Sequence, residues 1–331
     1  MVPLLVFLIL LLSGCAGFVS QDEVRQLQSF QNQDFAPQRP LSTRQSQQAL
    51  RSHQYTLKQL GRYENPRLQT YLELIGNKIE KISGDQRSVY QYTILDSEKI
   101  DAFIDSRTYV YITRGMLALI NSEAELVAIL SHEIAHSVAG HNEKRVRLMA
   151  QAAEQTDFID QVRQFELEAD ALAIKYAAAL NYDPSALSRI LRRIEAFEQE
   201  NFRKRILAGN SRKFILRTDN ERSFHPNSLK RSNLIGKLNE SISGDFIEGQ
   251  SAYYQAIENL PYGPAQDGRH YVVKIITASS TDTFNRYAFK AEADFINPNY
   301  LRIINDYRAQ QPPIVGTRLK IILPISEDVY R

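Results

Sequence analysis

Residues 122–141 read SEAELVAILSHEIAHSVAGH, and this stretch decides the fold. Its large aliphatic side chains recur at the spacing of one helix face, at Leu126, Leu130 and Ile134. That spacing predicts a largely buried helix. Ser122 and Glu125 fit a capping box, with the serine as N-cap and the glutamate at the third helical position, so we expect the helix to begin at Ser122. The helical pattern continues to about Leu180.

Within this helix, His132, Glu133 and His136 form an HExxH motif. Positions i and i+4 of a helix lie on one face, so both imidazoles can reach one metal ion. Catalytic zinc sites use three protein ligands and leave one position open, and the glutamate between the histidines can serve a hydrolysis as general base. Because buried histidines need polar partners, the motif favours a metal site over an ordinary core helix.

A third ligand is expected from the next helical stretch, where residues 166–170 read ELEAD. Glu166 and Asp170 are four residues apart and share a helix face. Glu166 is therefore a candidate metal ligand, and Asp170 a candidate partner that orients a histidine ring. Glu168 points away from this face, so we predict a surface charge there.

These motifs resemble the gluzincins of metallopeptidase family forty-eight, which includes the CAAX prenyl proteases and bacterial periplasmic proteases of the BepA and LoiP type. The resemblance covers roughly residues 45–265. It rests on motifs that occur in the family's order: TRGML at 113–117 with SEAEL at 122–126, HEIAHSVAGH at 132–141 with FELEAD at 165–170, LNYDP at 180–184, and HPNSLKR at 225–231.

The resemblance implies a zinc ion and a role for residues of each motif. The implied zinc ligands are His132, His136 and Glu166. Glu133 is the implied general base, and Asp170 the residue that orients a ligand. His225 and Arg231 match family residues near the metal, which implies oxyanion stabilisation or regulation.

Residues 108–113 read TYVYIT, a β-branched and aromatic run that predicts a strand. In the resemblance this strand is the sheet edge beside the cleft, where an extended peptide can add by backbone hydrogen bonds. The alternative is a core strand. The expected partners are protein or peptide substrates in extended conformation.

The other histidines of this region have simpler interpretations. His53 is expected to be exposed on a polar helix. His141 is expected to end the zinc helix, where a cation suits the helix C-terminus; a role as metal ligand is the alternative.

The N-terminus predicts a lipid anchor. Val2–Leu12 is an apolar run with the length of a signal-peptide core. It leads into Ser13-Gly14-Cys15-Ala16, which resembles the lipobox of bacterial lipoproteins; the alternative is a plain signal peptide. We therefore expect a signal peptide over residues 1–14, lipid on Cys15, and a Gln-, Ser- and Pro-rich tether over residues 15–44. The alanine after the cysteine favours the outer membrane, with the protein facing the periplasm.

Residues 266–331 predict a small separate module. Two strands, Tyr271–Ile276 and Arg318–Leu323, flank two helices that open near Thr283 and Asn297. This strand-helix-helix-strand order resembles a LysM-type module, a small glycan-binding fold. The resemblance adds peptidoglycan as an expected partner. A βααβ cap on the protease domain that binds no glycan is the alternative.

The whole chain of 331 residues is 43% hydrophobic and 24% charged, with a net charge of +2. This composition argues against disordered, collagen-like and disulfide-stapled proteins, and the balanced charge predicts no nucleic-acid partner. We expect an α+β fold: a mainly helical, zincin-like metalloprotease domain over residues 45–265 with a small sheet, followed by the βααβ module. The expected function is zinc-dependent endopeptidase of the bacterial envelope, and the family resemblance implies misfolded or unassembled envelope proteins as substrates. The alternative is a glycan-binding scaffold or chaperone-like assembly factor with little proteolysis.

Overall fold

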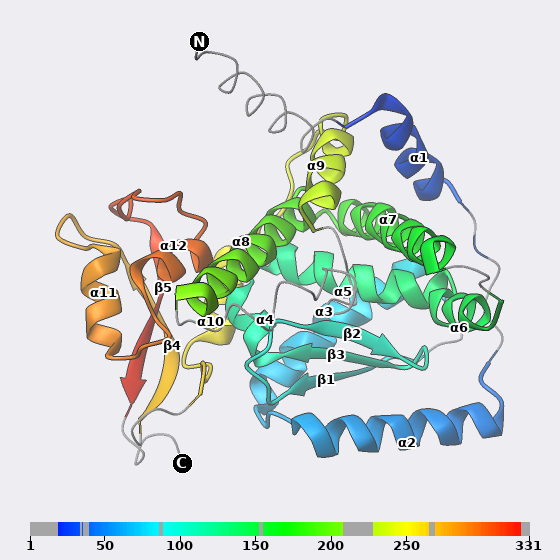
Figure 1. Ribbon diagram of the computed structural model, residues 1–331, viewed down its shortest axis with the longest axis horizontal. Helices are drawn as coiled ribbons and strands as arrows, with labels where there is room; N and C mark the ends of the chain where they lie inside the picture. Colours follow the sequence, from blue (N-terminus) through cyan, green and yellow to red (C-terminus); the bar gives the residue numbers. More distant parts are fainter. Residues whose placement is uncertain are drawn as a thin grey trace, which may run out of the picture.

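The computed structural model describes residues 19–33, 35, 40–85, 89–151, 155–207, 228–264 and 269–325. Over these residues the protein is mostly helical and has one three-stranded and one two-stranded sheet (Figure 1), so the predicted α+β class is confirmed. The apolar run Val2–Leu12, Cys15 and His225 lie outside the described residues. Within the described part, no helix is long and apolar enough to cross a membrane.

Helices account for most of the described chain. In chain order they are α1 (Gln21–Gln31), α2 (Thr43–Leu60), α3 (Pro66–Ser83), α4 (Arg114–Leu119), α5 (Glu123–Val138), α6 (His141–Gln151), α7 (Gln155–Ala179), α8 (Ala186–Leu207), α9 (Ser228–Asn239), α10 (Gln250–Ile257), α11 (Phe284–Ala291) and α12 (Pro298–Ile304). The strands are β1 (Gln91–Leu95), β2 (Ala102–Asp105), β3 (Tyr109–Thr113), β4 (His270–Thr277) and β5 (Arg318–Ile325).

The three-stranded sheet has the order β1-β3-β2, with β3 parallel to β1 and antiparallel to β2. The expectation that the strand over residues 108–113 is the sheet edge is therefore wrong, and the core alternative holds. The two edge strands are β1 and β2, and the sequence analysis missed β2. Ser106 and Arg107, both at positive φ (53° and 61°), are the central residues of a turn over residues 105–108 that folds β2 back onto β3. Such turns are usually signalled by Asn or Gly, and neither is present.

Helix α5 is the centre of the fold, buried along nearly its whole length between α3, the sheet and α7. Ser122 caps it as predicted, because its hydroxyl accepts from the Glu125 backbone N–H at 3.2 Å. The return half of the box differs: the Glu125 carboxylate accepts from the Asn121 N–H at 2.7 Å instead. The helix ends at Val138, since Gly140 follows in the left-handed region (φ 67°) and turns the chain into α6.

Part of the predicted tether is a docked helix. Residues 21–31 form α1, which Ser20 and Glu23 open with a complete capping box. Leu27 of α1 is fully buried, and Gln26 donates to Gln164 of α7 at 2.7 Å. The amphipathic spacing of this short helix is hidden by its many glutamines, so the composition alone indicated an unstructured segment.

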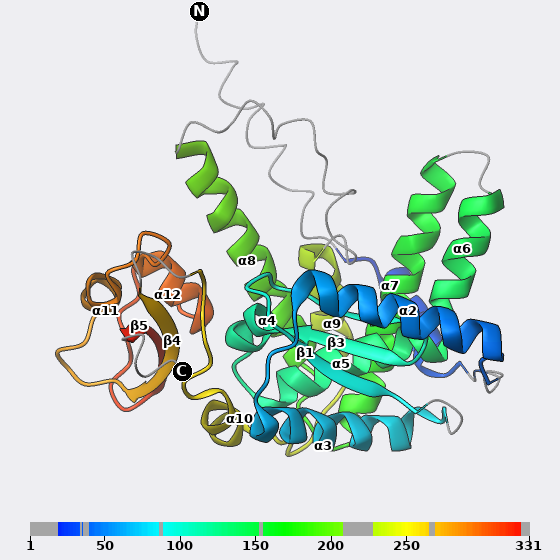
Figure 2. The same cartoon turned by 90° about the horizontal axis from the view of Figure 1, so that it is seen from below.

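The C-terminal strand-helix-helix-strand order is confirmed: β4 and β5 pair antiparallel, with α11 and α12 between them in the chain. This terminal unit forms its own lobe beside the end of α8 (Figures 1 and 2). Its contact with the larger part is buried and polar, because Lys320 of β5 donates to the carbonyls of Ala118, Leu119 and Ile120 at 2.6–3.0 Å. Burial lowers the pKa of Lys320 well below its ordinary value. Helix α10 packs into the main hydrophobic core through Tyr253, which is fully buried.

Candidate metal centre

Helices α5 and α7 bring the three candidate ligands together. The Nε2 atoms of His132 and His136 lie 3.1 Å apart. The Glu166 carboxylate faces both rings: its Oε2 lies 3.5 Å from Nε2 of His132, and its Oε1 lies 3.5 Å from Nε2 of His136. All three side chains are buried, and the i, i+4 spacing of the histidines is what aims both rings at α7.

This donor set fits a metal ion. The candidate ligand atoms of His132, His136 and Glu166 all lie within 4.8 Å of one another. Two imidazole nitrogens with one carboxylate oxygen form the set found in catalytic zinc sites that keep an open position. The geometry therefore supports a metal centre with three protein ligands.

Glu133 lines a cleft beside this centre. A cleft of about 800 Å³ runs between α2, β2 with its turn, α5 and α6, and Glu133 and His136 form the α5 part of its wall. Gln45 and Gln48 of α2 line the cleft, and so do Val146 and Met149 of α6. A carboxylate and a metal-binding face thus meet in a cavity large enough for a peptide segment.

Asp170 and Arg231 stand behind the ligands. An oxygen of Asp170 lies 3.0 Å from Nδ1 of His132, which leaves the Nε2 of this ring for the metal. Arg231 of α9 donates to both oxygens of Asp170, at 2.6 and 2.7 Å, and its third guanidinium nitrogen lies 3.0 Å from Glu166. Arg231 therefore contacts a ligand and the residue that orients a ligand.

These contacts shift the pKa values of His132 and Asp170. Burial lowers the pKa of His132, but the hydrogen bonds with Asp170 and Glu166 outweigh it and raise the pKa to about 9. Burial raises the pKa of Asp170, yet Arg231 and His132 outweigh that effect and hold it below its ordinary value. A proton and a metal ion compete for the same nitrogen of His132, so metal binding here releases protons.

Comparison with known proteins finds a family model that matches part of the chain. Residues 64–162 match the model of peptidase family M48. The matched segment contains the HExxH helix, whereas Glu166, Asp170 and Arg231 lie beyond its end. The M48 match agrees with the resemblance found in the motifs.

Two curated relatives have names of the same kind. The chain is 24% identical over 191 residues to the mitochondrial metalloendopeptidase OMA1 of Schizosaccharomyces pombe, covering 51% of this chain and 52% of that protein. It is 27% identical over 77 residues to a Vibrio cholerae protein named "Putative beta-barrel assembly-enhancing protease", covering 23% of this chain and 16% of that protein. The chain thus spans about half the length of the first relative and much less of the second.

Just past the HExxH helix of the M48 segment, the structure adds two residues to the centre. His141 opens α6 and is fully buried, with its Nδ1 2.8 Å from Nδ1 of His136. Its Nε2 lies 3.0 Å from a carboxylate oxygen of Glu168, and its ring stacks on Phe165 with centroids 4.6 Å apart. Burial holds the pKa of His141 below its ordinary value, so the ring is neutral at pH 7. The predicted surface charge at Glu168 is wrong, because this side chain is only 6% exposed.

His141 also differs from its prediction. It does not end the zinc helix, because the turn at Gly140 starts a new helix there. The turn brings the ring back against the outer edge of His136, a position that helical spacing from His136 does not give. Gly140, which follows the HExxH motif closely, is the sequence signal that could have predicted the end of this helix before His141.

His53 of α2 is buried rather than exposed. Its ring stacks on Tyr109 with centroids 4.2 Å apart, and its Nδ1 lies 2.7 Å from the hydroxyl of Tyr111. Both tyrosines belong to β3, so α2 covers the sheet through this histidine. His53 is thus a packing residue away from the metal centre.

Proposed function

We propose that this protein is a zinc-dependent endopeptidase. One observation carries the proposal: His132, His136 and Glu166 converge in a buried centre at the wall of a cleft that Glu133 also lines. The match to the M48 model and the names of both relatives support a peptidase. The intact Glu133 favours this function over a scaffold that binds and does not cleave.

Glu133 and Asp170 have different parts in the proposed hydrolysis. Zinc, when bound, supplies a Lewis acid that polarises the scissile carbonyl and makes water more acidic. Glu133 accepts a proton from the attacking water and returns it to the leaving amine, since it lies in the cleft next to the ligand histidines. Asp170 holds His132 in the tautomer that leaves Nε2 for the metal.

The substrate is proposed to be an extended peptide segment added to β2. The backbone N–H of Thr113 donates to the carbonyl of Asp101 at 3.0 Å, and the N–H of Asp101 donates to the hydroxyl of Thr113 at 3.2 Å. In this register residues 103 and 105 also turn their backbone groups toward β3, while residues 102 and 104 turn theirs away. The carbonyl of Ile104 indeed accepts from Asn142 of α6, on the cleft side. Pairing through backbone groups depends little on side chains, which suits unfolded substrates of varied sequence.

Digestion of casein by the purified protein tests the proposal. We expect cleavage that a chelator abolishes and added zinc restores. Digestion that is unchanged in chelator would contradict a metallopeptidase, and stoichiometric zinc without any digestion would favour the scaffold.

The place of action is proposed to be the bacterial envelope, with Cys15 lipidated in the outer membrane and the domain facing the periplasm. The lipobox-like sequence supports this, as does the name of the Vibrio cholerae relative. Misfolded or unassembled envelope proteins would then be the substrates.

Replacing Cys15 tests the anchor. Cys15→Ser is expected to abolish incorporation of labelled palmitate and to move the protein from the membrane fraction to the soluble fraction, because several acyl chains on one cysteine are needed for firm binding. Ser13→Ala, which leaves the thiol in place, is the matched control. Membrane retention of the Cys15→Ser protein would refute a lipid-only anchor.

Peptidoglycan is the proposed ligand of the terminal unit. Two loops lie side by side there, since Ala278 and Thr317 as well as Gly316 and Ala278 are joined by backbone hydrogen bonds of 2.8 Å. Beside them Ile314 and Val315 are 54% and 62% exposed, which offers an apolar face for a sugar ring. We expect the full chain to cosediment with purified sacculi and Val315→Glu to weaken this binding several-fold. Phe289→Glu on α11 is the control, and equal binding by all three proteins would contradict the site.

A further inference from the structure

The Nδ1 atoms of His132 and His136, which lie on the side of each ring away from the metal position, have different partners. His132 has a carboxylate directly against its outer nitrogen, because Asp170 lies 3.0 Å from Nδ1. His136 instead has the ring of His141 there, with the two Nδ1 atoms 2.8 Å apart. A carboxylate follows one step further out, since Glu168 lies 3.0 Å from Nε2 of His141. The support of His136 is thus a chain of two links.

Only one arrangement of protons fits the contacts from His136 through His141 to Glu168. His136 offers Nε2 to the metal, so its Nδ1 carries the proton and donates to Nδ1 of His141. His141 must then carry its own proton on Nε2, where it donates to the carboxylate of Glu168. The opposite tautomer of His141 would place two protons between nitrogens 2.8 Å apart.

The surroundings hold the chain in place. His141 is fully buried and its ring stacks on Phe165, one residue before Glu166. Glu168 is nearly buried, and the ammonium group of Lys144 lies 3.9 Å from the carboxylate oxygen that contacts His141. The links join α5, α6 and α7, so the ring of His136 is tied to the helix that carries Glu166.

We propose that His141 and Glu168 are positioning residues for the metal centre: they fix the tautomer and the ring orientation of His136. Neither contacts the metal in this arrangement, and both act through His136. The inference rests on the metal site of the proposed function and does not need the protein to be a peptidase.

Metal affinity of the full chain tests the proposal without any substrate. We expect His141→Leu to weaken zinc binding 10- to 100-fold in competition with a chromophoric chelator, the range seen when an outer partner of a ligand is lost. His141→Asn, whose amide can keep an acceptor near the Nδ1 position, should recover part of this loss. Glu168→Gln should weaken binding about 10-fold, and it should add nothing in the His141→Leu background, because Glu168 acts only through His141.

Two further measurements separate positioning from folding. The absorption spectrum of the Co²⁺-loaded protein should change in His141→Leu and Glu168→Gln, whereas Lys144→Gln, the matched control beside Glu168, should keep both the spectrum and the zinc affinity. Native affinity and spectrum in His141→Leu would overturn the proposal, as would additive losses in the double variant. If the native protein binds zinc tightly but cleaves nothing, the peptidase fails and the positioning role stands.

Discussion

Glu133→Gln is expected to lower the rate of peptide hydrolysis by about 10²–10⁴-fold, the usual contribution of a general acid–base. The amide has the shape of the carboxylate but cannot accept a proton from water. Glu133 is not one of the residues that converge on the metal position, so the variant should keep its zinc. kcat/KM on a fluorogenic peptide and the metal content of the same preparation check both expectations.

Glu166→Gln is the matched comparison, since it makes the same chemical change at a candidate metal ligand. It replaces a carboxylate that lies 3.5 Å from both ligand histidines, so we expect loss of metal together with loss of hydrolysis. The pair of variants separates proton transfer from metal binding. A Glu133→Gln protein that digests peptide at the native rate would remove Glu133 from the mechanism.

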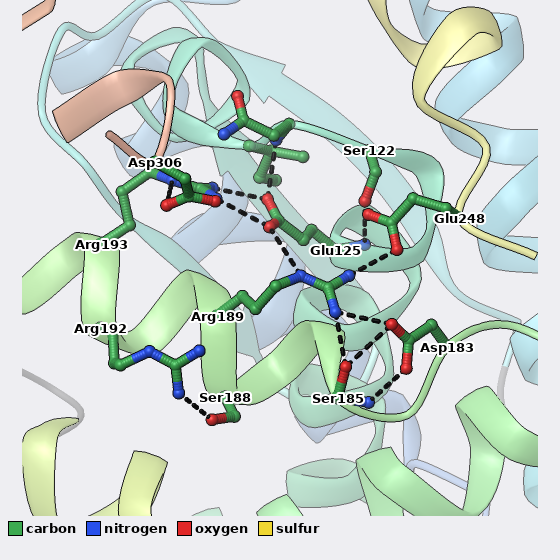
Figure 3. Close-up of polar contacts among 12 residues, drawn as sticks. Ser122, Glu125, Asp183, Ser185, Ser188, Arg189, Arg192, Arg193, Glu248 and Asp306 are labelled. Atoms are coloured by element: carbon green, nitrogen blue, oxygen red, sulfur yellow. Dashed lines mark hydrogen bonds and ion pairs between the residues drawn. The ribbon is translucent and has the colours of Figure 1, made fainter. Parts of the chain in front are cut away.

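The second large effect is on stability. Arg193 of α8 is fully buried and donates to both oxygens of Glu125 at 2.6 and 2.9 Å, to the carbonyl of Leu119 at 3.1 Å, and to Asp306 (Figure 3). Arg193→Leu leaves Glu125 buried at the start of α5 without this cation. Breaking a buried pair in this way costs about 3–5 kcal/mol in the free energy of unfolding.

Urea unfolding of the full chain, followed by circular dichroism, measures this loss. Arg163→Leu is the control, because its ion pair with Asp160 is solvent-exposed and should contribute little. Adding Glu125→Leu to Arg193→Leu should restore part of the stability, since the buried charge is then removed as well. An unchanged unfolding midpoint for Arg193→Leu would contradict the role of this pair.

Arg193, which pairs with Glu125, also contacts the terminal unit. Asp306 follows α12, so Arg193 connects this unit to the first turn of α5. Lys320 makes a second buried connection to the end of α4. We therefore expect the two parts to unfold in one transition, although the sequence analysis treated them as separate domains.

What the sequence by itself determined is local. The i, i+4 spacing of His132 and His136 places both on one helix face wherever α5 lies, and the spacing of Glu166 and Asp170 does the same on α7. The break after Leu180 and the strand-helix-helix-strand order near the C-terminus also follow from local signals, and the structure has both. Each of these features depends on residues within one or two turns of each other.

Only the tertiary structure decided which polar groups are buried together. The sequence predicts Glu168 and His53 at the surface and His141 at the end of the HExxH helix, because their partners are supplied by other helices or strands. β2 lies at a sheet edge because a turn without glycine folds it back onto β3. Arg193 pairs with Glu125, which lies 68 positions earlier in the chain. Burial and pairing of a charge depend on neighbours that are distant in sequence, and local periodicity carries no information about them.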